Sequence, residues 1–428
     1  MAELAKDPNG LELEDLIAAH FASRGCYVEM GVKERSPDEI LDLDVVWTDY
    51  KRDPLLPLPV EIKSGDWGIG DVFKFYGWTK YLGLQSGQFI HKKPIGRVQP
   101  ETLEHIKKKT GISFLYLQSN EEAGRHFQEL GLDQSCDENL SELWRFSFWI
   151  QRRLFKSLSL SIKTGHCKAS ARKAKEYYQL INSAVFFIPE ILERITALLK
   201  AHFDHQELAA TAAYEIETGN VEFKSPPQSR IFTDAYYGGK HFPVQACLYL
   251  AHRARLYILK VLVDYWLSVN ERGVKKCIPA RFLLPSGMVG ALEEMAKAKS
   301  FRMFPVFWQT FLFSWGGFIW KDKLEEEYAA LEKETGVQRD EIPIALSVFD
   351  KLFPIKDGWF RSPSGDARSV LILMPPAMRG VGAFRRLMMA NLDKYNELGL
   401  SREVLKRMQI DHNSGARILD SAEEDLVN

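Results

Sequence analysis

Hydrophobic periodicity divides the chain into a mixed N-terminal part and a mainly helical remainder. Over residues 10–24 apolar side chains recur every three or four positions, as on one face of a helix. Residues 40–47 instead alternate between apolar and polar, which is the period of a half-buried strand. Together with the segments that follow as far as residue 117, these two give the predicted order of elements α-β-β-β-α-β-α-β. We therefore expect an α/β domain over residues 1–135, with a mixed central sheet flanked by helices.

Glycine and proline mark the ends of these segments. Gly25 ends the first helix. The gap before the third strand holds Pro54, Pro57 and Pro59, so we expect that it does not belong to a central strand. The remaining segments are predicted as strands over 26–30 and 60–64, a helix over 70–83, a strand over 87–90, a helix over 100–111 and a strand over 112–117.

From residue 136 onward the helical period dominates, and few segments look like strands. Residues 136–428 are therefore expected to form one or more mainly helical domains, with a sub-boundary near 219–240, where a loop is predicted. The polar residues 412–428 are expected to fray. The predicted helices cover 138–163, 169–200, 205–217, 244–271, 286–299, 322–335 and 382–408.

One segment of the helical part, residues 303–320, carries no charge. Its 18 residues reach the lower length limit for a membrane span. Pro305, Gln309 and the pair Gly316–Gly317 interrupt it, however. We predict a buried helix, and contact with a membrane is the alternative.

Composition and charge say little about the function of the protein and more about the cellular compartment in which it is expected. The net charge of −1 gives no overall attraction to nucleic acid, so any basic surface must be local. Five cysteines at irregular spacing favour neither a disulfide framework nor a zinc site. The first residues lack an apolar signal core, and we expect a cytoplasmic protein.

Four ionisable side chains are predicted to meet on one face of the sheet. Residues i and i+2 of a strand share a face, so Asp42 lies with Asp44, and Glu61 lies with Lys63. If the two strands form a hairpin, three acids and one lysine lie together on a half-buried surface. Such a surface is costly without a partner, and a hard divalent cation is an obvious one. Asp42 is expected to be exposed or paired with a lysine rather than a ligand.

The first helix supplies a further acid. On a helical wheel Glu14 lies beside Ile17 and Phe21, at the edge of the apolar face, and points toward the sheet. Glu12 and Asp15 are expected to face solvent on the opposite side.

These motifs resemble those of the PD-(D/E)xK nuclease superfamily, especially Mrr-like restriction enzymes and archaeal Holliday-junction resolvases. The resemblance covers residues 10 to about 130. Its first element is a helical Glu eleven residues before a glycine, here Glu14 and Gly25. The second is the strand DLDVV (42–46), and the third is VEIKS (60–64). The usual proline of the motif is absent, and the helix after the lysine lacks the usual glutamine.

The resemblance implies a restriction-endonuclease-like fold and metal-dependent hydrolysis of phosphodiester bonds. Asp44, Glu61 and the backbone carbonyl of Ile62 would hold Mg²⁺, with Mn²⁺ as a substitute. Lys63 would stabilise charge and handle a proton, and Glu14 would be an accessory catalytic residue. The chain has no Walker or Rossmann loop, so no nucleotide cofactor is expected.

A second Glu-x-Lys copy, Glu222 to Lys224, lacks an upstream alternating Asp strand and is predicted to be a loop. Residues 143–175 contain no acid and carry nine basic residues interleaved with aromatic ones. This run favours phosphate binding, and a solvated helix face paired with acids elsewhere is the alternative. The predicted nucleic-acid contacts are Arg152, Arg153, Lys156, Lys163, Lys168, Arg172 and Lys173, with Lys74 and Lys80 on the helix after the lysine strand. A second acid-free run, 367–392, is a weaker candidate for phosphate contact.

The residues beyond the nuclease-like part suggest a module for sensing, target reading or partner binding. A restriction or anti-phage nuclease acting on DNA is accordingly the predicted role. The alternatives are a junction-resolving or repair nuclease, a non-catalytic protein that binds nucleic acid or a partner, and a membrane-associated effector. A homodimer or a partner protein bound through the helical region is left open.

Overall fold

The computed structural model describes residues 7–34, 38–53, 55–94, 99–119, 127, 130, 132, 138–163, 175–176, 188, 190–201, 242–271, 286–320, 323–353, 370–373 and 378–390. The chain divides into two compact units. We call residues 4–149 with 182–190 the N-terminal unit, and residues 1–3 with 150–181 and 191–428 the C-terminal unit. The predicted decoy copy at 222–224 lies outside the described residues.

The N-terminal unit contains one five-stranded mixed sheet in the order β1-β2-β3-β4-β5. Strands β1, β2 and β3 pair antiparallel, whereas β3, β4 and β5 are parallel and joined by helices. This confirms the predicted order of elements. Their bounds are α1 Leu11–Ala22, β1 Tyr27–Glu34, β2 Leu41–Thr48, β3 Leu58–Lys63, α2 Ile69–Tyr81, β4 Gly87–His91, α3 Pro100–Thr110 and β5 Ile112–Tyr116.

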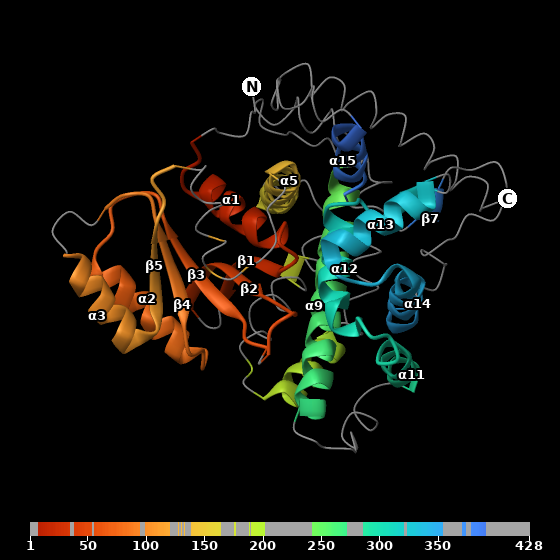
Figure 1. Cartoon of the computed structure of the whole chain (residues 1–428), viewed down its shortest axis with the longest axis horizontal. Helices are drawn as coiled ribbons and strands as arrows, with labels where there is room; N and C mark the ends of the chain where they lie inside the picture. The colour runs from red at the N-terminus through yellow and green to blue at the C-terminus, as the bar shows by residue number, and fades with distance from the viewer. Residues whose placement is uncertain are drawn as a thin grey trace. The chain divides into compact units, whose positions relative to one another are not determined.

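Helices cover the sheet according to the alternation of its apolar side chains. Helix α1 packs beside β1 and β2, while α2 contacts β4 and α3 contacts β5 (Figure 1). Phe21 of α1 stacks on Trp47 of β2, with ring centroids 4.7 Å apart. Phe75 of α2 instead meets Phe89 of β4, edge to face, at 6.4 Å. Strand register places Phe89 beside Glu61, so the ionisable face of β3 is the face that α2 approaches.

Two expectations about this unit are wrong. Asp15 is only 1% exposed, because α1 is buried over almost its whole length rather than along one stripe. Pro59 belongs to the central strand β3, where it pairs with Val46. The β3–β4 ladder begins only at Val60, so the absent N–H of Pro59 interrupts no bond to β4.

The C-terminal unit is mainly helical, as predicted. Helix α5 (Glu138–Lys163), which crosses the boundary between the units, matches its predicted span. A short helix, α14 (Ile342–Leu352), and a two-stranded sheet of β6 (Phe318–Trp320) and β7 (Val370–Leu373) were not predicted. The predicted segments 205–217, 219–240 and 391–408 lie outside the described part. The other elements are α9 Phe242–Glu271, α11 Ser286–Met295, α12 Phe304–Phe313, α13 Leu324–Thr335 and α15 Arg379–Ala390.

The uncharged segment forms helix α12 followed by a turn and β6. All ten residues of α12 are buried. Trp308 stacks on Phe349 of α14 at 3.8 Å, and its indole N–H donates to the Ala345 carbonyl at 3.1 Å. The prediction of a buried helix is therefore confirmed. Among the described helices, none combines the length and the apolar character that crossing a membrane requires.

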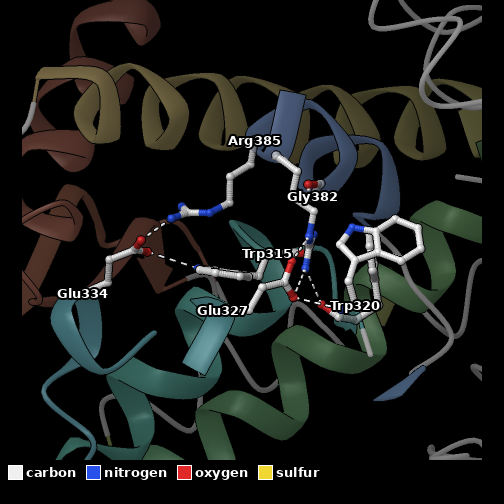
Figure 2. A network of polar contacts seen from close by, with 8 residues as sticks. Trp315, Trp320, Glu327, Glu334, Gly382 and Arg385 are labelled. Carbon is white, nitrogen blue, oxygen red and sulfur yellow. Dashed lines mark hydrogen bonds and ion pairs between the residues drawn. The ribbon is translucent and has the colours of Figure 1, made fainter. Parts of the chain in front are cut away.

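Two arginines, one buried and one half-buried, attach α15 to α13 and β6. Arg385, 2% exposed, pairs with Glu334 and lies over the Trp315 ring at 4.3 Å (Figure 2). Arg386 binds Glu327 with its Nε at 2.5 Å and donates to the Phe318 carbonyl at 2.6 Å. Both charges thus have acidic partners, and phosphate contact elsewhere in the run 367–392 stays a prediction.

Gly382 is required where α15 crosses the turn after α12. A Cβ atom at this position would lie 2.2 Å from the Trp315 carbonyl oxygen. Gly382→Ala is therefore expected to push α15 away from β6 and to lower the free energy of unfolding by about 1–3 kcal/mol. The measurement is urea unfolding of the full chain.

Gly290 in α11 is the matched control, since an added Cβ there meets nothing within 4 Å. Gly290→Ala is expected to stabilise by about 0.5–1 kcal/mol, because alanine favours a helix. Equal stability of the two variants would contradict the close packing at Gly382.

Candidate active site

Asp44 lies where the β2–β3 ladder ends. The last paired residues are Val45 and Val60, and beyond them the Asp44 carboxylate replaces a backbone partner. Its Oδ2 accepts the Ile62 N–H at 2.7 Å. A side chain held in this way cannot rotate freely, so β3 fixes one carboxylate oxygen and leaves the other available.

Glu61 and Lys63 project from β3 on the face that α2 approaches. Glu61 is 6% exposed, and its Oε1 lies 2.5 Å from the Lys63 ammonium. The other oxygen, Oε2, is buried and has no hydrogen-bond partner among the described residues. Lys63 is half-buried and also feels the charges of Asp44 and Asp71. The ion pair therefore satisfies the lysine better than it satisfies the glutamate.

Glu14 is brought to the same place by the start of α1. The Gly10 N–H donates to the Ser64 hydroxyl at 2.9 Å, which attaches the chain before α1 to the residue after Lys63. Lys92, just beyond β4, holds the same segment by binding Asp7 and the Pro8 carbonyl. With the start of α1 held there, the negative charge of Glu14 acts on Asp44 and contributes to the rise in its pKa.

The electrostatic balance of this site is negative. Burial, then the charges of Glu61 and Glu14, raises the pKa of Asp44 to about 8. Burial also raises the pKa of Glu61, although Lys63 opposes the shift. The pKa of Lys63 rises in turn, because the neighbouring carboxylates outweigh its own burial. Repulsion between these acids thus persists although Lys63 and Lys74 oppose it, and a cation would reduce it further.

The donor set fits a hard cation, although the described acids are not arranged as a formed metal site. Asp44 and Glu61 offer oxygen ligands of the kind that Mg²⁺ prefers, and Oε2 of Glu61 is a buried oxygen without a partner. No group of three or more His, Cys, Asp or Glu side chains within the described ranges has the arrangement of a formed metal site. Asp42 pairs with Lys33, as expected, although its charge also contributes to the raised pKa of Glu61.

The predicted nucleic-acid residues fall into two sets. Lys74 and Lys80 lie exposed on α2. Arg152 is half-buried in α5, and Arg145 of the same basic run is 4% exposed and pairs with Glu142 at 3.4 Å, so its side chain does not face solvent. Outside the described structure lie the side chains of Arg153, Lys156 and Lys163 and the whole of Lys168, Arg172 and Lys173.

Sequence reasoning missed an aromatic cluster beside Lys63. His91 is the register partner of Lys63, and Trp67 lies over its ring at 4.5 Å. Both donate a hydrogen bond to the Lys93 carbonyl oxygen, at 2.8 Å from the Trp67 indole N–H and at 2.9 Å from His91 Nδ1. His91 is 4% exposed, and burial lowers its pKa. Alternation along β4 would have placed His91 and Phe89 on the face of Lys63, had the register been known.

Comparison with protein-family models, with curated proteins and with solved structures finds no match to this chain.

Proposed function

We propose that the N-terminal unit is a metal-dependent nuclease related to the PD-(D/E)xK superfamily. The observation that carries the proposal is the convergence of Asp44, Glu61 and Lys63 at one end of β3, with the Glu14 charge beside them. Carboxylates held close together and partly out of water are unfavourable for folding, and such strain is typical of functional sites. The reaction proposed is hydrolysis of phosphodiester bonds in DNA.

Each residue has a separate task in this proposal. Asp44 and Glu61 would hold Mg²⁺ or Mn²⁺, together with the Ile62 carbonyl. When bound, the cation would lower the pKa of a water molecule and stabilise charge on a phosphate. Lys63 lies close enough to Glu61 to stabilise charge at the same phosphate. Ser64 positions Glu14 by binding Gly10.

The biological role is proposed on the arrangement of the chain. The C-terminal unit contains most of the chain and is mainly helical, so it would supply sensing, target reading or partner binding for a restriction or anti-phage nuclease. Junction resolution or repair is the alternative for the same site. Efficient cutting of four-way junctions, with linear DNA left intact, would favour that alternative.

The direct test is incubation of the purified chain with plasmid DNA. We expect cleavage with 1–10 mM Mg²⁺ or Mn²⁺, on the order of magnitude that weakly held Mg²⁺ sites need, and no cleavage with EDTA. Linearised plasmid, a four-way junction and an RNA of similar length are tested in parallel. Absence of cleavage from every substrate with either metal would contradict the proposal.

A non-catalytic role in binding nucleic acid is the second candidate. The observation in its favour is that Lys63 already binds Glu61 and that the described acids do not form a closed metal site. Tight binding of DNA that is insensitive to Mg²⁺, together with no cleavage, would support it over the nuclease.

A further inference from the structure

Helix α2 presents an unusual outer surface. Its inner side is conventional, because Val72, Phe75 and Thr79 are buried against the sheet. On the outer side, however, Phe73 is 52% exposed and Tyr81 is 56% exposed. They are the only aromatic side chains among the large hydrophobic ones left exposed in the described part of the chain, and both lie on this helix, so this surface has the character of a binding site.

Two lysines of the same helix lie over aromatic rings. The Lys74 ammonium is 4.6 Å from the centre of the Trp78 ring, and that of Lys80 is 5.4 Å from the centre of the Tyr76 ring. Each lysine therefore joins a positive charge to a flat ring. The first-turn acid of α2, Asp71, is used to cap the Gly68 N–H at 2.8 Å. The exposed surface is consequently aromatic and mainly positive, with one acid, Glu34 of β1, at its edge, where it accepts a hydrogen bond from Tyr81.

Gly77 lies at the centre of this surface. Residues three and four positions apart are neighbours on a helix, and the four such neighbours of Gly77 are Phe73, Lys74, Lys80 and Tyr81. A Cβ atom at Gly77 would meet nothing within 4 Å, so packing within the chain does not require glycine. Glycine inside a helix destabilises it. Bare backbone framed by two lysines and two exposed rings suits the close approach of a ligand.

We propose that this surface binds a nucleic-acid strand with unpaired bases, with phosphates at Lys74, Lys80 and the backbone of Gly77 and bases on the exposed rings. The two lysines favour a negatively charged polymer by charge complementarity, and the exposed rings favour groups with flat faces on which they can stack, such as bases. A continuous duplex covers those faces by stacking, whereas an unpaired strand exposes them.

The same surface lies on a helix that approaches the candidate active site. Phe75 of α2 packs against Phe89, the register partner of Glu61, so α2 lies beside the acids, and the charge of Lys74 opposes the rise in the pKa of Glu61. The inference rests on the proposed function, since the strand held on α2 is the strand offered to that site. It adds that the preferred substrate contains single-stranded or locally opened nucleic acid.

The test measures the affinity of the full chain for fluorescent oligonucleotides by anisotropy, in EDTA so that nothing is cut. The probes are a 20-nucleotide poly(dT) strand, a 20-base-pair duplex and the same duplex with a central gap. We expect the strand and the gapped duplex to bind at least about 10-fold more tightly than the duplex. Replacing Phe73 and Tyr81 by leucine should weaken strand binding by about 10-fold or more, and duplex binding much less, because stacking is lost.

Gly77→Ala separates binding from folding. The variant should raise the Tm by about 1–4 °C, because alanine favours the helix, while it weakens strand binding. Lys74→Ala should weaken binding of all probes, and Lys108→Ala, an exposed lysine on α3, is its matched control.

The outcomes distinguish this inference from the nuclease proposal. Tighter binding of the duplex, no binding of any probe, or strand affinity unchanged by both the ring and Gly77 variants would overturn the inference. Metal-dependent cleavage of intact duplex would still support the nuclease in that case. Strand binding that follows the ring and Gly77 variants, without any cleavage, would support the inference and count against the nuclease.

Discussion

Lys63→Ala is expected to reduce cleavage by about 10²–10³-fold while metal binding is retained. Loss of one preorganised charge contact to the transition state typically has this effect. The proposed ligands Asp44 and Glu61 remain in the variant, and Oε1 of Glu61 loses the ammonium that held it at 2.5 Å. Cleavage is measured on plasmid DNA, and metal binding is measured separately by calorimetric titration.

Lys224→Ala is the matched control, because Glu222 to Lys224 repeats the Glu-x-Lys spacing without an upstream alternating Asp strand. It should cut as the wild type does. Normal cleavage by Lys63→Ala, or its loss in Lys224→Ala, would show that the chemistry does not lie at the end of β3.

Asp44→Asn is expected to have opposite effects on stability and activity. The pKa of Asp44 is about 8 in the folded protein and about 3.8 when unfolded, so ionisation favours the unfolded chain. Below about pH 4 the Asp44 carboxyl is neutral in both the folded and the unfolded chain. As the pH rises toward 8 it ionises in the unfolded chain first, and the folded state progressively loses stability relative to the unfolded chain. Without metal the variant should therefore be more stable by about 1–3 kcal/mol at pH 8, and little changed near pH 4.

Bound metal should reverse the order of stability of the wild type and Asp44→Asn. Asparagine keeps an acceptor for the Ile62 N–H, so the local hydrogen bond survives. A neutral amide is a poor ligand for a hard cation, and the variant should lose both cleavage and the rise in Tm that Mg²⁺ gives the wild type. Thermal unfolding at pH 4, 6 and 8, with EDTA and with Mg²⁺, measures all of these effects.

Asp42→Asn provides the control, since Asp42 is on the same strand but pairs with Lys33 at the surface. Its effect on stability should stay below about 1 kcal/mol at each pH. A variant at Asp44 that is no more stable than wild type at pH 8 in EDTA would contradict the excess of buried negative charge.

Local pattern was sufficient to predict the elements of the N-terminal unit. The alternation in 40–47 and the glycines that end helices give the strands and helices of the five-stranded sheet within a few residues. The face shared by Glu61 and Lys63 also follows from alternation alone. These features depend on neighbours in sequence, which is why one sequence can reveal them.

The features that were missed depend on partners far along the chain. The pairing of β6 with β7 joins residues about fifty positions apart, and neither three- nor four-residue strand has a period that can be recognised. The partners of Arg385 and Arg386 lie on α13, so their charges looked free in the sequence. The Asp44 contact with Ile62 likewise depends on the end of the β2–β3 ladder, which only the register reveals.

The residues of the candidate site all come from one short part of the chain. Glu14, Asp44, Glu61 and Lys63 lie within positions 14–63, and β2 and β3 are consecutive antiparallel strands. Contacts so close in sequence form early in folding, and a chain folds from its N-terminus as it leaves the ribosome. Most of the C-terminal unit is synthesised afterwards. Any restraint that the helical region exerts on the site would therefore begin only after translation has passed the site itself.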